Sequence, residues 1–327
     1  MSFAKSILFC ALLAFAANAS AVTMNWSYVG NPGNPVDTSV MSFDGSTGYG
    51  SVPRNYFIGT YDVTYNQYTE FLNAKDPGGA NLLGLLYTDM LSAPDGGINF
   101  NPHAADGSKY SVQSGAGSHP VTYVSWYDTI RFANWMNNGQ GSGDTETGAY
   151  TLGPLRANGL PLNPPATHNA GAHIWLPTEN EWYKAAYYNP GTSSYFLYPT
   201  SSNTTPISSS PTALPNHANF APGGTGFITN VGAYTGTTSP YGAFDMGGNV
   251  MQWNEALISG AHREFRGGSF FGAFSDTLRS STLFFADPSL YQSVDVGFRL
   301  AMTPEPSTLA LAAIGFIALA WRLRRHA

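Results

Sequence analysis

The stretch Leu176-Pro177-Thr178-Glu179-Asn180-Glu181-Trp182 carries the clearest structural signal in this sequence. Thr178 can cap a helix with its hydroxyl group, and Glu181, three residues later, can bond back to the cap, so the two residues form a capping box. The predicted helix continues to about Tyr188, where Asn189-Pro190-Gly191 ends it. The stretch therefore predicts one short, capped helix just past the middle of the chain.

Two more capping boxes lie upstream of this stretch. Thr64-Tyr65-Asn66-Gln67 predicts a helix over residues 65–74, and Ser125-Trp126-Tyr127-Asp128 predicts a largely buried helix that stops at Asn137-Asn138-Gly139. Residues 195–239 are instead rich in Ser, Thr, Pro, Asn and Gly with little periodicity. This composition predicts long irregular loops, which are uncommon in a compact domain unless something pins them.

The composition is that of a globular protein with few charges. Of 327 residues, 43% are hydrophobic and 14% are aromatic, which is enough for a packed core. Only 10% are charged, against about a quarter in an average soluble domain, so amides and hydroxyls supply most of the polarity. Because no internal repeat and no second domain boundary occurs, we expect a single domain.

Residues 1–21 have the form of a secretory signal peptide. Lys5 is followed by an apolar run over residues 7–17 and by Ala19-Ser20-Ala21, a small-x-small cleavage signal. A buried first helix is the alternative. Cleavage at the end of this signal removes Cys10, the only cysteine, so the mature chain has no disulfide and no thiol chemistry.

Residues 302–327 form a second targeting segment. Pro304-Glu305-Pro306 precedes an apolar stretch over residues 308–321, and a basic end over residues 322–325 follows it. The stretch predicts a short transmembrane helix with its basic end in the cytoplasm. The segment resembles the PEP-CTERM sorting signal, which implies transient insertion in the inner membrane and processing by an exosortase-type enzyme. We therefore expect a protein at the cell envelope surface, or one secreted after processing; an anchor that is never cut is the alternative.

Removing both ends leaves a mature domain with a net charge of about −9, compared with −6 for the whole chain. Nucleic acids and anionic lipids are bound by basic patches, because attraction between opposite charges and the release of counterions drive that association. We therefore expect no nucleic-acid partner for this protein.

Six sequence blocks between residues 22 and 301 occur in the order and spacing of one known family. They are Tyr61-Asp62-Val63-Thr64 with Glu70-Phe71-Leu72-Asn73, His119-Pro120-Val121 with Val124-Ser125-Trp126, Leu176–Trp182, Gly247–Trp253, Arg266–Phe270 and Gly297-Phe298-Arg299. The region 22–301 resembles the formylglycine-generating enzymes, or sulfatase-modifying factors. The resemblance implies a single compact α+β domain, related to C-type lectin folds, with little regular secondary structure.

The chemistry of that family depends on a pair of cysteines that hold copper. The resemblance places this pair at fixed offsets after a Gly-Gly-Ser motif, which in this sequence fall on Gly272 and Thr277. Neither residue ligates copper as a thiolate does, so we expect no copper cofactor and no formylglycine-generating activity. The seven histidines form no HxH or HxxxH pair, so we expect no histidine metal site either.

Calcium is the ion that the resemblance implies, as a structural pin for the loops. It takes oxygen ligands from carboxylates, amides and main-chain carbonyls, which Asn- and Gly-rich loops supply. In the first predicted site Gln252 replaces the family's usual glutamate, and in the second Thr225 replaces an aspartate, so both sites lose charge. Loops closed by hydrogen bonds alone are the alternative. The first set is Asp245, Gly248, Val250 and Gln252, and the second is Asn219, Phe220, Thr225 and Phe227.

The segment around Gly272 and Thr277 forms the active-site groove in the enzymes. Aromatic faces beside amide and hydroxyl groups suit sugars or extended peptides, so our first hypothesis is a non-catalytic surface module that binds a polysaccharide or a protein there. The candidate groove residues are Arg279, Phe271, Phe274 and Asp276.

Two other functions stay open on the sequence. One is an oxidoreductase of the same superfamily with unidentified chemistry, for which Asp276, Asp287 and Tyr291 are the available polar groups. The other is a purely structural protein of the extracellular matrix.

Overall fold

The computed structural model describes residues 21–92, 95–154, 165–272 and 274–304. The predicted signal peptide, except for Ala21, and the apolar stretch of the tail lie outside the described residues. In the described part of the chain, no helix is long and apolar enough to cross a membrane.

Three α-helices begin at the three capping boxes: α1 (Tyr65–Lys75), α2 (Trp126–Asn137) and α3 (Glu179–Tyr187). In each of them, the cap hydroxyl accepts the main-chain N–H three residues later, and the side chain of that later residue accepts the N–H of the cap. Every residue of α2 except the last is buried. The structure confirms the three predicted helices, with ends within one residue of those expected.

Two four-stranded sheets form the centre of the domain. In order of pairing, their strands are β1 (Trp26–Val29), β2 (Tyr56–Gly59), β14 (Ala301–Met302) and β5 (Ile174–Trp175), then β12 (Phe284–Ala286), β11 (His262–Arg266), β10 (Met251–Ile258) and β13 (Val296–Phe298). In the first sheet β14 pairs with β2, so the last described strand joins the first ones. In the second sheet β10 is antiparallel to β11 and parallel to β13.

The other regular elements are short. They are the two-stranded ribbons β3 (Ile98–Phe100) with β4 (Tyr110–Val112), β6 (Tyr188–Asn189) with β7 (Ser194–Tyr195) and β8 (Ile207–Ser208) with β9 (His217–Ala218), and the single-turn helices η1 (Thr88–Leu91) and η2 (Ser275–Leu278). Residues 195–239 carry only two-residue strands, which confirms the predicted loops.

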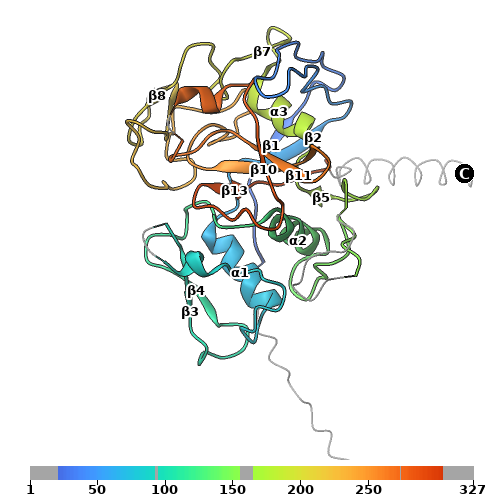
Figure 1. The fold of residues 1–327 in the computed structure, drawn as a ribbon, viewed down its shortest axis with the longest axis vertical. Coiled ribbons are helices and arrows are strands. Elements are labelled where there is room, and N and C mark those ends of the chain that lie inside the picture. The colour runs from blue at the N-terminus through green and yellow to red at the C-terminus, as the bar shows by residue number, and fades with distance from the viewer. Residues whose placement is uncertain (1–20, 93–94, 155–164, 273, 305–327) are drawn as a thin grey trace, which may run out of the picture.

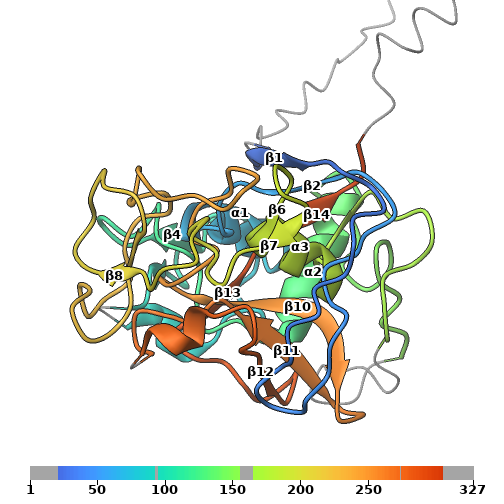
Figure 2. The same ribbon diagram turned by 90° about the horizontal axis from the view of Figure 1, so that it is seen from above.

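Figure 1 shows α1, α2, β3 and β4 in one half of the domain, and α3 with the loops around β8 in the other, with β10, β11 and β13 between the two halves. Seen from above, β1 and β14 lie close together on one side of the domain (Figure 2), as their common sheet requires. The short helix η2, coloured orange-red, lies on the side away from β1 and β14 in this view. The surface next to η2 therefore faces away from the two ends of the described chain.

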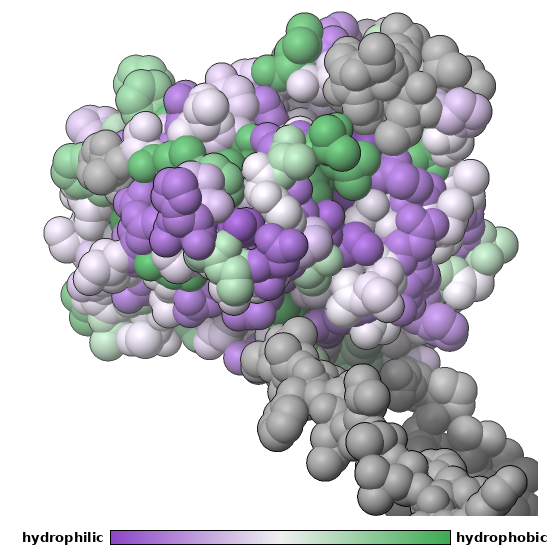
Figure 3. All heavy atoms as spheres, turned by 90° about the horizontal axis from the view of Figure 1, so that it is seen from below, coloured by the Kyte–Doolittle hydropathy of each residue, from purple (hydrophilic) through white to green (hydrophobic). Residues whose placement is uncertain are grey.

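The interior is rich in aromatic residues. Trp126, Trp175, Trp182 and Trp253 are all buried. The face of the molecule in Figure 3 is mostly polar, and its apolar residues form small separate spots. That face therefore offers no broad apolar surface for a partner.

Two arginines of the family blocks, Arg266 and Arg299, are fully buried. Arg299 donates to the carbonyl oxygens of Gly59 (2.8 Å) and Phe244 (2.9 Å) and to the carboxylate of Asp62 (3.1 Å). Its planar guanidinium can form several hydrogen bonds at once, so this side chain joins its own strand end to two segments that are far away in the sequence.

Candidate functional site

The two positions that correspond to the family cysteines, Gly272 and Thr277, lie side by side. A Cβ atom placed on Gly272 would be 3.4 Å from the hydroxyl oxygen of Thr277. The main-chain N–H of Gly272 donates to the carbonyl of Ser269 (3.1 Å), and the hydroxyl of Thr277 donates to the carbonyl of Phe274 (2.7 Å). The turn that brings the pair together is therefore present, although neither side chain is a thiolate.

Two phenylalanines near this pair in the sequence have exposed side chains. Phe271 is 71% exposed and Phe274 is 68% exposed, whereas Phe270, next to Phe271 in the sequence, is only 3% exposed and belongs to a small core cluster. The chain bends at both residues, so that the ring of Phe270 lies in the core cluster and the ring of Phe271 lies at the surface. Phe271 and Phe274 therefore do not fill the interior.

The remaining two candidate residues form a surface ion pair in the same segment of the chain. The guanidinium of Arg279 donates from Nε to the carboxylate of Asp276 (2.8 Å), and its Cζ lies 5.3 Å from the centre of the Tyr198 ring. Both charged side chains are exposed. The surface next to η2 thus combines two exposed rings with a balanced pair of charges, and we call Phe271, Phe274, Asp276 and Arg279 the aromatic surface.

The first predicted calcium set surrounds the start of β10. The carboxylate of partly buried Asp245 accepts the main-chain N–H of Gly232 (2.6 Å), and desolvation of this carboxylate raises its pKa to about 6. The side-chain oxygen of Gln252 accepts N–H groups from Trp182 (2.8 Å) and Arg299 (2.7 Å), and its amide nitrogen donates to the carbonyl of Asp245 (2.7 Å). Asp245 therefore fits a calcium ligand, whereas the Gln252 oxygen does not while Arg299 donates to it.

Gly248 and Val250, the main-chain members of the first set, lie next to the second set. Gly248 has a φ of +80°, and an added Cβ would lie 2.6 Å from the carbonyl oxygen of Asn219, so only glycine fits there. Val250 is buried in a small cluster with Ile228 and Phe270. The two predicted sets are thus neighbours in space.

The members of the second predicted calcium set also meet. The side-chain oxygen of Asn219 accepts the main-chain N–H and the hydroxyl of Thr225 (both 3.1 Å), and its amide donates to the carbonyl of Phe227 (2.8 Å). The carbonyl of Phe220 accepts the N–H of Gly224 (3.0 Å). Because these oxygens bond to donors of the loop itself and none is a carboxylate, the set does not fit a divalent ion.

The polar groups proposed for an unidentified oxidoreductase serve local structure. Asp287 caps its own turn, since its carboxylate accepts N–H groups from Ser289 (2.8 Å) and Leu290 (3.1 Å). The ring of Tyr291 stacks on Phe265, with 5.2 Å between the ring centres. These contacts account for both residues without a reaction.

A cleft that the sequence did not indicate lies at the start of α3. It has a volume of about 250 Å³, and Arg54, His168, Glu181 and Glu255 are among the residues that line it. His168 and Glu255 are 87 residues apart, and His168 lies in a loop without a periodic pattern, so nothing in the sequence pairs them. Close contact between His168 and the carboxylate of Glu255 makes this the second candidate site of the domain.

The fold and the turn at Gly272 and Thr277 define a class of protein, the formylglycine-generating-enzyme fold. Residues 47–304 match the model of the sulfatase-modifying factor enzyme 1-like domain, and the chain belongs to this family. Residues 303–325 match the PEP-CTERM protein-sorting motif, which implies export to the cell envelope surface and processing by an exosortase-type system. No curated protein matches the chain.

Solved structures with this fold include three that match along most of the chain. CarF is 22% identical with a TM-score of 0.54, and the match covers 86% of this chain and 99% of CarF. Treponema denticola variable protein 1 is 19% identical with a TM-score of 0.52, covering 88% and 97%. PvdO from Pseudomonas aeruginosa is 17% identical with a TM-score of 0.51, covering 85% and 94%. At these identities the likeness shows the fold alone.

Proposed function

We propose that this domain is a non-catalytic binding module of the cell surface, and that its aromatic surface binds a polysaccharide. The observation that carries the proposal is the exposure of Phe271 (71%) and Phe274 (68%) beside the positions of the family cysteine pair. Two large rings left in water cost free energy unless a partner covers them, since each could bury roughly 150–250 Å². Two exposed phenylalanines beside the positions of the family cysteine pair favour a binding role over a purely structural one.

The chemistry around the rings favours a sugar as the ligand. A pyranose presents one apolar face that stacks on an aromatic ring and a rim of hydroxyl groups that need hydrogen-bond partners. Arg279 and Asp276 supply a donor and an acceptor, and their mutual ion pair leaves the surface without a net charge. A protein segment is the alternative ligand, and it would use the same rings.

The lack of catalysis follows from the ligands that the chain offers. Copper(I) is held by soft thiolates, and Gly272 and Thr277 contribute a hydrogen atom and a hydroxyl group that is already bonded. Removal of the signal peptide would take the only cysteine, Cys10, with it. The geometry of the family site therefore persists without the atoms that perform the reaction.

The position of the aromatic surface also suits a surface module. The sorting motif follows β14 directly in the chain, and η2 lies on the other side of the domain (Figure 2). A domain held at its C-terminal end would therefore present the rings away from the point of attachment. Export by the N-terminal signal peptide belongs to the same proposal.

Binding to purified acidic and neutral exopolysaccharides tests this proposal, measured as retardation of the protein in a polysaccharide-containing native gel. We expect Phe271→Ala and Phe274→Ala to abolish retardation, and Phe43→Ala to leave it unchanged. Phe43 is the control, because it is also an exposed phenylalanine and its ring packs on Phe285. Equal retardation of all variants would contradict the proposed surface, and retardation by no polysaccharide would favour a protein ligand.

Calcium is a second, separate part of the proposal. Asp245, Gly248 and Val250 would hold the ion, and the support is that Asp245 is a partly buried carboxylate to which only one hydrogen-bond donor, Gly232, is seen in the described residues. When bound, the ion would neutralise that carboxylate and fix the loops that meet there. Gln252 would add no charge, so we expect weaker binding than a glutamate at this position would give.

A further inference from the structure

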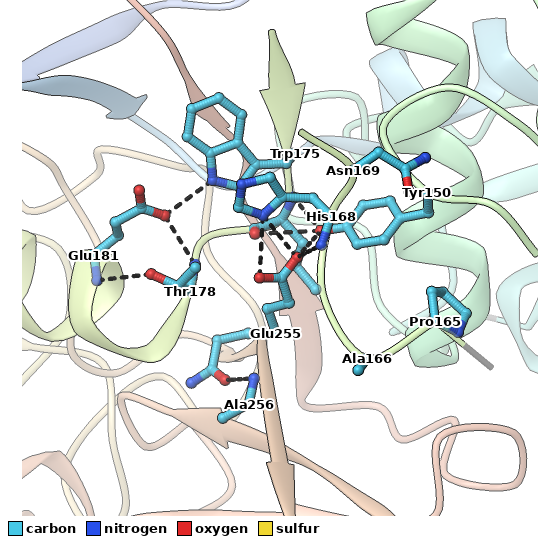
Figure 4. Close-up of polar contacts among 12 residues, drawn as sticks. Tyr150, Pro165, Ala166, His168, Asn169, Trp175, Thr178, Glu181, Glu255 and Ala256 are labelled. Atoms are coloured by element: carbon cyan, nitrogen blue, oxygen red, sulfur yellow. Dashed lines mark hydrogen bonds and ion pairs between the residues drawn. The ribbon is translucent and has the colours of Figure 1, made fainter. Parts of the chain in front are cut away.

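The cleft at the start of α3 holds an imidazole whose position is fixed from three directions (Figure 4). Nδ1 of His168 lies 2.9 Å and 3.1 Å from the two carboxylate oxygens of Glu255, and the main-chain N–H of His168 donates to the same carboxylate (2.6 Å). The ring stacks on Trp175, with 4.9 Å between the ring centres. His168 therefore cannot turn without losing these contacts.

The carboxylate of Glu255 decides which nitrogen of His168 carries the proton. Glu255 is buried, and it also accepts the hydroxyl proton of Tyr150 (2.8 Å). A buried carboxylate beside Nδ1 requires a proton on that atom, because two lone pairs facing each other without a proton would repel. In the neutral form of the ring, the N–H is thus at Nδ1 and the lone pair is at Nε2.

The lone pair at Nε2 is available to a ligand. His168 is 19% exposed and lines the cleft, and within the described residues no hydrogen-bond partner of Nε2 is seen. A fixed imidazole with Nε2 open to a cleft accepts a hydrogen bond from a hydroxyl group.

A guanidinium borders the same cleft. Arg54 donates to the carboxylate of Glu181 (2.8 Å), which is itself held by the indole N–H of Trp175 (2.9 Å) and the main-chain N–H of Thr178 (3.0 Å). The side chain of Arg54 is 47% exposed, and its Cζ lies 5.4 Å from the centre of a Trp175 ring. One end of the guanidinium is thus anchored, and no hydrogen-bond partner of its other N–H groups is seen in the described part of the chain.

From these groups we infer that the cleft binds a small hydroxy acid, with the size and chemistry of a single uronic acid unit. Arg54 would hold the carboxylate, and Nε2 of His168 would accept a hydroxyl proton of the same molecule. The volume of about 250 Å³ suits one sugar ring, and Val52 and Pro53 provide an apolar wall beside the polar groups. A simple anion would pair with Arg54 but place lone pairs against Nε2, and a neutral sugar would leave the open guanidinium N–H groups without a carboxylate.

This inference is independent of the aromatic surface, because it concerns a different set of elements and a single sugar unit. Titration of the purified protein with sodium D-glucuronate tests it, followed by the ring signals of His168 in ¹H–¹⁵N NMR spectra. We expect saturable shifts with glucuronate, and at least tenfold weaker binding of both glucose and acetate. We expect Phe271→Ala to bind glucuronate as the unchanged protein does.

Two variants assign the binding to the cleft. His168→Asn keeps a side-chain N–H near the position of Nδ1 for Glu255 but removes the acceptor at Nε2, and Arg54→Gln keeps a donor for Glu181 but removes the charge. We expect each to weaken glucuronate binding at least tenfold at an unchanged melting temperature, and His103→Asn, in an exposed turn, to change nothing. Absence of saturable shifts, equal binding of acetate or glucose, or undiminished binding by both cleft variants would overturn the inference.

Discussion

Truncation of single phenylalanines separates a binding surface from a packed one. Phe271 buries only about 30% of its area, or roughly 60 Å² of a side chain of roughly 200 Å², whereas Phe270 buries nearly all of it. At about 25 cal/mol per Å², Phe271→Ala costs about 1.5 kcal/mol of unfolding free energy and Phe270→Ala about 5 kcal/mol. For a domain of this size the melting temperature should fall by roughly 3 °C and roughly 10 °C, respectively.

The effect on binding should run in the opposite order. A sugar that covers half of the exposed face of Phe271 removes roughly 70 Å² from water, which is about 1.8 kcal/mol or about twentyfold in Kd. Phe270→Ala, at a temperature where it is folded, should bind nearly as well as the unchanged domain. The assay pairs thermal melting by circular dichroism with affinity electrophoresis on the same samples.

The reasoning fails if Phe271→Ala lowers the melting temperature as much as Phe270→Ala does, because the ring would then be packed. It also fails if the polysaccharide binds Phe271→Ala with unchanged affinity. Phe274→Ala, with 68% exposure in place of 71%, should follow Phe271→Ala in both measurements and serves as an internal repeat.

The remaining predictions concern buried charge, calcium and copper. Burial raises the pKa of Asp62 to about 7, whereas its pKa in the unfolded chain is near 4. The protonated carboxyl group therefore contributes its full stability below the unfolded pKa, and this contribution is lost as the pH rises through 7. With a chelator present, the unfolding free energy of the unchanged protein should fall over this range by about 4 kcal/mol more than that of Asp62→Asn. A flat difference between the two pH profiles would refute that shift. If calcium binds, a chelator should lower the melting temperature of the unchanged protein but not that of Asp245→Ala. Identical melting temperatures of the unchanged protein with calcium and with chelator would refute the proposed calcium site. Cysteines at both Gly272 and Thr277 should bind one copper(I) ion in competition with a chelating dye, while either cysteine alone should not; failure by a folded double variant would show that the groove has been rebuilt.

Local signals in the sequence were sufficient for the helices and for the family fold. A capping box consists of two residues three positions apart, so it can be recognised in a short stretch of sequence. Thr64, Ser125 and Thr178 each cap a helix, as predicted. The closeness of Gly272 and Thr277 was also expected, because they correspond to two cysteines that hold one copper ion in the family that the sequence resembles. These features depend on few, local interactions.

The cleft at His168 could not be predicted in the same way. Its contacts join a loop, a strand and a helix start, and no periodicity relates His168 to Glu255 or Arg54. The difference between Phe270 and Phe271 was likewise invisible, since two identical neighbouring residues have the same propensities and only the surrounding fold decides which is buried. Long-range packing, and not residue type, creates both features.

The contacts of Arg299 that hold the loops together could not be predicted from the sequence, which indicated only calcium for this role. The structure places a guanidinium at the centre of one loop cluster: Arg299 pairs with Asp62 and donates to the oxygen of Gln252. A glutamate at position 252 would add a third acid, with Asp62 and Asp245, around one arginine in a buried place, and such an excess charge is costly unless a cation offsets it. The neutral Gln252 removes that excess. The substitution that weakens the calcium ligand set is therefore the one that gives Arg299 an uncharged acceptor in this loop cluster.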